Sequence, residues 1–367
     1  MIPRPADTEL KHRIRPSRLF HPPDRDALEG VEQMGPGVCQ PVVDMAMLHV
    51  VINSIMRLAG GKGHSAFNLV CFRFLLIGCA AMCVISTECA AQPKARASLG
   101  EAVTFHASFD GQADADFALG DSILYHAPHW EDRMQRTAGL PQEVTHVPDG
   151  GRYGDGLEFS VARNPVIVLF NADRNVAYGD SSWNGTVSFW LSLNPDEDLA
   201  PGFSDPLLIT SKNWNDAALF VDFTRDDTPR HFRFAAFADE DVWNQPPREW
   251  EDVPISERPM IEIGDPAFAR DTWTHVVMTF ERFNTGGEDG MLTGYLNGER
   301  IGTLAGREQT FSWNTDEAVI ALGINYVGRF DDLALFDRAL TDSEVEALYR
   351  LDRGVAALGR GGMQQER

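Results

Sequence analysis

Hydrophobic and polar residues alternate in short segments along most of the chain after residue 101. In the segment 186–193, Val187, Phe189, Leu191 and Leu193 would point to one side of a strand. This alternation predicts a half-buried strand whose second face is available for contacts. The same pattern predicts strands at 102–109, 156–160, 206–210, 217–223, 231–237, 273–281, 291–296, 300–304, 318–324 and 327–336.

The dipeptide Asn297-Gly298 lies between two of these strands. It predicts a hairpin with a type I′ turn, because both central residues of that turn need positive φ. Many short strands with Gly, Pro and Asn turns and almost no helix predict an all-β fold of two antiparallel sheets, a sandwich or jelly roll. We expect residues 92–353 to form this single domain.

One helix is predicted, close to the C-terminus. Thr341 and Glu344 are spaced as in a capping box, in which each side chain bonds to the backbone of the other residue. The helix is expected to run to about Leu351. The glycine-rich segment 354–367 that follows is expected to be a flexible tail.

The first 91 residues differ from the rest of the chain. Residues 74–86 are uncharged and apolar, follow several basic residues and precede small ones, so 56–91 is predicted to be a secretory signal peptide. The apolar run is shorter than the roughly 20 residues that span a bilayer. Translation is then expected to begin at Met56, with 1–55 untranslated or disordered. An uncleaved anchor, a lipid anchor or a buried helix are the alternatives.

Charge and cysteine content narrow the function of the remaining part. All five cysteines lie in residues 1–91, so an exported protein would contain no disulfide. Those residues hold nine Lys and Arg and eight Asp and Glu, which leaves 23 basic and 46 acidic residues, a net charge of −23. Such a charge repels phosphate backbones and anionic lipids, so nucleic acid and membrane surfaces are not expected partners.

Four segments together resemble a known family: 186–191, 273–280, 294–302 and 328–341. In this order they are similar to the LamG-like jelly roll, a branch of the concanavalin A-like lectin/glucanase superfamily. The resemblance implies one convex and one concave sheet, with carbohydrate or protein ligands on the concave face or the rim. It does not fix the function, because such folds carry many.

The resemblance also implies what a catalytic member would need. Glucanases of the superfamily carry Glu-x-Asp-x-Glu on a strand, which places carboxylates on one face. No such run occurs here. Asp331 and Asp332 are adjacent and are expected to point to opposite faces, whereas Asp239 and Asp241 lie in a proline-rich loop. We therefore expect no enzymatic activity, and a diverged glucanase is the third hypothesis.

A structural calcium ion is also implied by the resemblance, since several related domains hold one between their first and last strands. The matching acids would be Asp110 with Asp331 or Asp332. Calcium needs six to eight oxygen ligands. The alternative is that Asp332 is solvated or forms an ion pair, for example with Arg338.

Candidate ligand contacts come from tryptophan residues beside polar side chains. Trp243, Asn244 and Trp250 lie in the long segment 239–268, and Trp214 lies between two asparagines. Aromatic faces suit the apolar side of pyranose rings. The leading hypothesis is therefore a secreted, non-catalytic module that binds a polysaccharide or glycan. The alternative is a structural or protein-interaction domain of the cell envelope.

Overall fold

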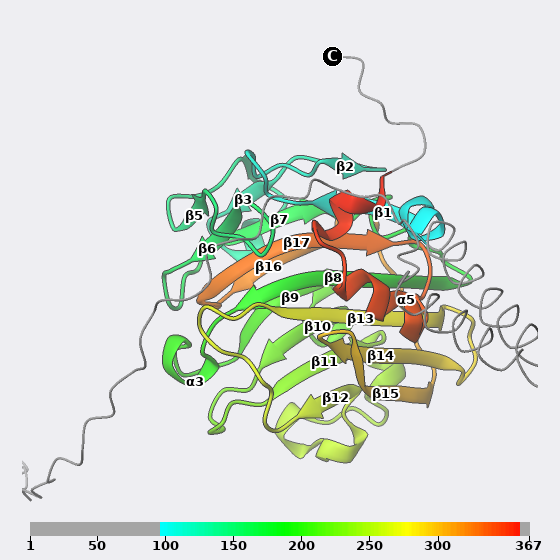
Figure 1. Ribbon diagram of the computed structural model, residues 1–367. Helices are drawn as coiled ribbons and strands as arrows, with labels where there is room; N and C mark the ends of the chain where they lie inside the picture. The colour runs from blue at the N-terminus through cyan, green and yellow to red at the C-terminus, as the bar shows by residue number, and fades with distance from the viewer. Residues whose placement is uncertain (1–95, 360–367) are drawn as a thin grey trace, which may run out of the picture. The chain divides into compact units, whose positions relative to one another are not determined.

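The structure is a computed structural model that describes residues 96–359 (Figure 1). The predicted signal peptide at 56–91 and the segment before it lie outside the described residues. Among the residues described, no helix is long and apolar enough to cross a membrane.

Two antiparallel sheets form the domain, as the strand pattern predicts. The nine-stranded sheet has the order β15 (Glu299–Arg307), β14 (Gly290–Leu296), β13 (Thr274–Phe283), β8 (Trp183–Ser192), β17 (Gly328–Phe336), β1 (Val103–Ala107) and β2 (Phe117–Ala118), with β6 (Gly156–Phe159) and β5 (Val144–Val147) joined to β17. The eight-stranded sheet has the order β12 (Met260–Ile263), β11 (Phe232–Phe237), β10 (Asp216–Phe223), β9 (Ser204–Asn213), β16 (Val319–Ile324), β7 (Ile167–Asn171), β3 (Tyr125–Ala127) and β4 (Thr137–Ala138).

The main hydrophobic core lies between the two sheets. Alternate residues of each strand enter it, because successive side chains of a strand point to opposite faces. Phe189 and Phe330 of the nine-stranded sheet stack there, and Leu219 and Phe234 of the other sheet are fully buried in the same core. The fold is thus the concanavalin A-like jelly roll that the sequence predicted.

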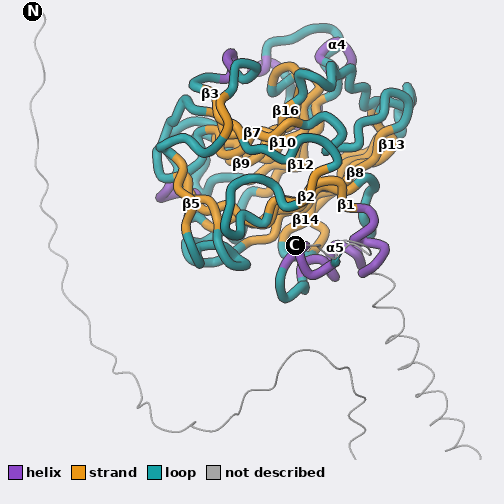
Figure 2. The backbone as a smooth tube through the Cα atoms, turned by 90° about the horizontal axis from the view of Figure 1, so that it is seen from above, coloured by secondary structure: helices purple, strands orange, loops and turns teal. Residues whose placement is uncertain are grey.

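The outer face of the nine-stranded sheet is covered, which corrects the prediction of an available second face on β8. Helix α5 (Asp342–Tyr349) and the 3₁₀ helix η4 (Gly354–Leu358) pack over it. Trp190 is only 2% exposed and stacks on Tyr349, with ring centroids 5.7 Å apart. Figure 2 shows α5 on the opposite side of the sandwich from α4 (Glu240–Trp243).

The first part of the segment predicted to be a flexible tail is an ordered 3₁₀ helix, Gly354–Leu358. Val355 and Leu358 of η4 are buried in the cluster beneath α5, because both side chains are apolar and the sheet offers an apolar surface. The prediction of a flexible tail is therefore wrong for 354–358.

Both local signals are confirmed. Asn297 and Gly298 have φ of 51° and 82° and join β14 to β15. Thr341 and Glu344 form the capping box at the start of α5. The sequence missed shorter elements: β2, β3, β4, β5, β7 and β12, the helices α3 (Pro195–Asp198) and α4, and the 3₁₀ helices η1 (Trp130–Asp132), η2 (Trp250–Asp252) and η3 (Ile255–Glu257).

Candidate ligand-binding groove

A groove of about 420 Å³ lies on the outer face of the eight-stranded sheet, on the side that α5 does not cover. This volume falls within the range of pockets that hold small ligands. Its lining is mostly apolar and aromatic, with several charged groups. The lining residues are Trp130, Ile167, Phe203, Asp205, Leu208, Asn213, Trp214, Phe220, Asp222, Arg233, Trp250, Glu251, Met260 and Ile324.

A buried ion pair lies in this lining. Asp222 of β10 is directly opposite Arg233 of β11 in the sheet register. The Arg233 Nε donates to Asp222 Oδ1 at 2.8 Å, and its Nη2 donates to Oδ2. The two side chains are 3% and 5% exposed. Burial raises the pKa of the Asp222 carboxyl, and the Arg233 charge opposes that rise.

A second carboxyl, Asp205, lines the groove beside this pair. The β9–β10 ladder pairs Val221 with Leu207 but Phe223 with Ser204, so β9 carries an extra residue at this point. Such a bulge changes the direction of the side chains next to it. Burial and the charge of Asp222 raise the pKa of Asp205 well above its usual range, and Arg233 lowers it only in part.

Two of the predicted ligand residues, Trp214 and Trp250, line the groove. Trp214 is 43% exposed in the β9–β10 turn, and its ring meets that of Trp250 edge to face at 5.3 Å between centroids. The Arg258 guanidinium lies 4.0 Å from the Trp250 ring centroid and holds that ring in place. The pair therefore presents aromatic surface to the groove.

Two further aromatic residues complete the lining. Trp130 of η1 has the Arg133 guanidinium 4.6 Å from its ring centroid. Phe203 precedes β9, is 37% exposed, and lies 5.0 Å from the Arg233 guanidinium. The groove thus has aromatic side chains from four separate segments around a charged centre.

The other two predicted ligand residues hold the loop together. Trp243 packs edge-on against Phe237, and its Nε1 donates to the backbone oxygen of Asn215. Asn244 is 3% exposed, and its side chain both donates to and accepts from the backbone of Arg248. Neither residue lines the groove.

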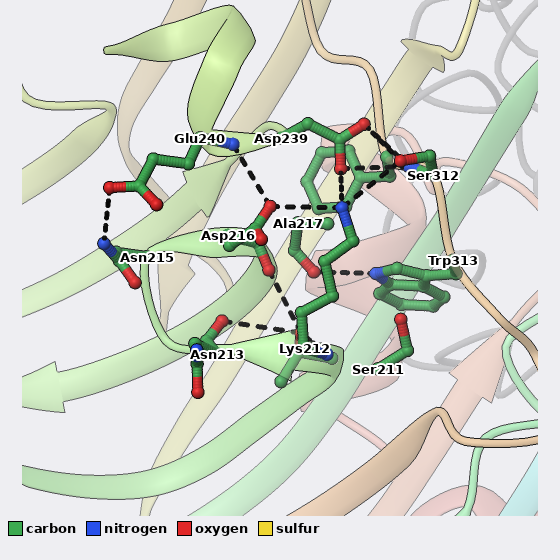
Figure 3. Close-up of polar contacts among 12 residues, drawn as sticks. Ser211, Lys212, Asn213, Asn215, Asp216, Ala217, Asp239, Glu240, Ser312 and Trp313 are labelled. Atoms are coloured by element: carbon green, nitrogen blue, oxygen red, sulfur yellow. Dashed lines mark hydrogen bonds and ion pairs between the residues drawn. The ribbon is translucent and has the colours of Figure 1, made fainter. Parts of the chain in front are cut away.

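The turn that carries Trp214 is fixed by Lys212, which Figure 3 shows among three partners. The Lys212 Nζ lies 2.6 Å from Asp239 Oδ1, 3.2 Å from Asp216 Oδ1 and 3.2 Å from Ser312 Oγ. Burial lowers the pKa of Lys212, but the bonds to Asp239 and Asp216 outweigh it and raise the pKa. The lysine is therefore a charged tether between β9 and the start of the 239–268 segment.

The three acids predicted to bind calcium do not share a site. Asp110 Oδ1 accepts from the backbone of Asp155, and Asp332 bonds through one oxygen to His106 and through the other to the amide of Val355. Within 96–359, no three His, Cys, Asp or Glu side chains form a group that could hold a metal ion. The arrangement of these three acids does not fit a calcium site. Calcium binding itself is not tested by this arrangement and stays a prediction of the sequence.

Asp331 and Asp332 were expected to point to opposite faces of the sheet, but both side chains lie on its outer face. Asp332 has φ of 50° at a bulge in β17, and both carboxyls contact segments that cover the outer face, Tyr153 and η4. Burial raises the pKa of the fully buried Asp331 to about 8, and the Asp332 charge contributes to the rise.

The sequence analysis missed the charged residues of the groove. A signal was present: Asp222 interrupts an apolar strand between Val221 and Phe223, and Arg233 interrupts the next between Phe232 and Phe234. Opposite charges inside adjacent apolar strands indicate a buried cross-strand pair. Asp205 could not be found in this way, because its position depends on the bulge.

Comparisons with known proteins give one family match and several similar solved structures. No curated protein matches the chain. Among solved structures, domain 4 of AbnA, a GH43 extracellular arabinanase from Geobacillus stearothermophilus, in complex with arabinotriose, is 16% identical, with 68% of this chain and 98% of that domain covered and a TM-score of 0.42. The binding domains of Paraclostridial Mosquitocidal Protein 1 and of botulinum neurotoxin serotype D are 18% and 14% identical, with TM-scores of 0.41 and 0.44.

These comparisons define how far the similarity extends. The alignments cover 68% and 70% of this chain but only 52% of each toxin binding domain, so the chain spans about half their length. A sequence profile described as the concanavalin A-like lectin/glucanases superfamily matches residues 168–346. That range contains all four segments that suggested the family. Residues 168–346 are therefore similar to the concanavalin A-like lectin/glucanases superfamily.

Proposed function

We propose that this protein is a non-catalytic carbohydrate-binding module and that its ligand lies in the groove of the eight-stranded sheet. The observation that carries the proposal is the combination of two aromatic rings, those of the exposed Trp214 and the partly buried Trp250, with polar groups in one groove. Sugar rings have apolar faces that pack on aromatic surfaces, while their hydroxyls need hydrogen-bond partners. Asn213, Asp205 and Glu251 offer such partners within the same lining.

Binding without cleavage is the better supported of the two carbohydrate functions. Hydrolysis of a glycosidic bond uses one carboxyl as the acid and a second, free to reach the sugar or a water, as nucleophile or base. Here both oxygens of Asp222 accept from Arg233, and that side chain is 3% exposed. For this protein to act as a diverged glucanase, the ion pair between Asp222 and Arg233 would have to break so that Asp222 could reach the substrate.

A glycan and polysaccharide array on the full chain, followed by calorimetry with the best ligand, tests the proposal. We expect saturable binding that Trp214→Ala and Trp250→Ala each weaken by about tenfold, because each removes a stacking surface. Ile301→Ala is the matched control, since Ile301 is 40% exposed on β15 of the other sheet.

The outcomes of this experiment separate the hypotheses. Loss of binding in the tryptophan variants alone supports the groove. No binding to any glycan contradicts the proposal and favours the protein-interaction domain. Release of reducing sugar from a bound polysaccharide would show a glucanase instead. Repeating the array in chelator tests the predicted calcium.

We also propose that the protein is exported and acts outside the cell or in the cell envelope. The support is the apolar run at 74–86 and the small residues that follow it, a pattern typical of signal peptides. N-terminal sequencing of the protein recovered from its producing cells is expected to begin at Gln92. Recovery of any residue before Gln92 would contradict cleavage at that site.

A further inference from the structure

Three carboxyls line the groove, and Asp205 is the one that neither bonds to a cation nor lies on the solvent-exposed rim. Asp222 takes the guanidinium of Arg233 with both oxygens. Glu251 is on the exposed rim, whereas Asp205 is only partly exposed. No hydrogen bond or ion pair reaches the Asp205 side chain from any residue in the described range 96–359.

The charge balance of the groove is therefore negative. Its lining contains three carboxyls, Asp205, Asp222 and Glu251, and a single cation, Arg233. Glu262 of β12 is opposite Arg233 in the sheet register and adds a further negative charge close to Arg233. Arg258 packs against Trp250 and does not line the groove. A ligand with its own carboxylate or sulfate would meet uncompensated like charge.

A cationic ligand supplies what this site lacks. An ionised carboxyl out of solvent is costly unless a positive charge is close. Burial and the charge of Asp222 raise the pKa of Asp205, which agrees with a carboxyl that has no bonded cation in the groove. An ammonium group beside Asp205 would favour the carboxylate form, and the proton of the free carboxyl would pass to the amine or to solvent.

The aromatic rings around the carboxyl suit the same ligand. Trp214, Trp250, Trp130 and Phe203 all line the groove with Asp205. Arginine guanidinium groups already lie against Trp250, Trp130 and Phe203, whereas no cation in the described residues lies over the Trp214 ring. The Trp214 face can therefore attract a ligand cation as well as the apolar face of a sugar ring. A sugar that carries a primary amine satisfies both the rings and the carboxyl.

We propose that Asp205 binds the ammonium group of an amino sugar, so that the groove selects glycans with free amines over N-acetylated and acidic ones. This inference rests on the proposed function and specifies its ligand class. Selectivity arises from one ion pair between Asp205 and the ligand. The other contacts in the groove are available to charged and neutral sugars alike.

The test compares two ligands that differ only in the acetyl group. Calorimetry of the full chain with a β-1,4-linked glucosamine tetramer and with its N-acetylated counterpart, near neutral pH, is expected to show a preference of about tenfold or more for the free amine. A galacturonic acid tetramer is expected to bind most weakly.

Variants assign the preference to one carboxyl. Asp205→Asn keeps the shape and removes the charge, and it is expected to reduce the preference to within about twofold, because the ion pair with the amine is lost. Asp205→Ser is a second variant in case the first is unstable. Glu299→Gln is the control: Glu299 is exposed on β15 of the other sheet and does not line the groove, so this variant is expected to keep the preference.

The outcomes distinguish this inference from the function on which it rests. Equal binding of the two tetramers, or a preference that survives in Asp205→Asn, overturns the inference. Binding of other neutral glycans, lost in Trp214→Ala, would then leave the proposed function standing. The ligand ratio on the unaltered chain tests the inference even if both Asp205 variants fail to fold.

Discussion

At the scale of single residues, Asp331 combines full burial with an incomplete set of hydrogen bonds. Its Oδ2 accepts from the amide of Tyr153 at 2.9 Å, while its Oδ1 is buried without a partner. Burial raises the pKa of this carboxyl to about 8 in the folded protein. In the unfolded chain an aspartate has a pKa of about 3.9. The folded state therefore holds a proton that the unfolded state has lost between these two values.

This difference predicts a pH dependence of stability. Because the folded pKa is raised, the free energy of unfolding falls as the pH rises from about 4 to about 8. Asp331→Asn removes the titrating group and keeps an acceptor for the Tyr153 amide. We expect the variant to be more stable than the unaltered chain near pH 8, by on the order of 3 kcal/mol, with little difference near pH 5. Urea denaturation at both pH values measures this.

The same experiment separates a protonated Asp331 from a metal-bound one. If Asp331 were a calcium ligand, Asp331→Asn would lower stability near pH 8, and chelator would lower the stability of the unaltered chain but not of the variant. Asp196→Asn is the control, because Asp196 is exposed, is not among the acids predicted to bind calcium, and its Oδ1 accepts from the backbone amide of Arg230 as an asparagine oxygen can.

At the scale of elements, the β9–β10 turn depends on contacts from outside its hairpin. Lys212 ties it to Asp239, and the Asn215 side chain donates to Glu240 at 3.3 Å. Trp214 projects from the centre of this turn into the groove. Lys212 itself does not line the groove, so it would affect a ligand only by holding Trp214 in position.

We predict that Lys212→Met weakens binding of the array ligand by about threefold to tenfold, because Trp214 loses its fixed place. Overall stability should fall by only about 1 kcal/mol, since the lysine is 31% exposed and solvent screens its ion pairs. Hydrogen exchange should increase in 213–216 and 239–244. Lys212→Arg is expected to restore much of the affinity, and unchanged exchange in Lys212→Met would contradict the tether.

The elements also show which features a sequence can predict. The Asn297-Gly298 turn and the Thr341 capping box were predicted because their geometry is set within four residues. The buried outer face of β8 was not, since it depends on α5, which lies some 150 residues later in the chain. The place of Asp205 in the groove depends on a bulge, and a bulge changes the register without a strong local signal.

At the scale of the whole molecule, the sequence suggests candidate ligand residues but does not tell which of them line the groove. Trp214, Trp250, Trp243 and Asn244 were all chosen for their residue types. Only Trp214 and Trp250 line the groove. The Trp243 side chain donates to the backbone of Asn215 in the β9–β10 turn, and the Asn244 side chain donates to the backbone of Arg248 within the loop. The composition of the loop gave no means to separate them, since the separation follows from how the loop packs on Phe237 of the sheet.

The net charge of −23 on residues 92–367 predicts how salt affects the folded domain. Self-repulsion destabilises a compact state, and salt shortens the range of that repulsion. Raising NaCl from about 20 mM to about 200 mM near pH 8 should therefore increase stability by about 1 kcal/mol, or roughly 2–4 °C in Tm. Near pH 5, where more carboxyls are protonated and the net negative charge is smaller, the same salt should have less effect. A fall in Tm near pH 8 would show that local ion pairs, such as Arg338 with Glu344, outweigh the overall repulsion.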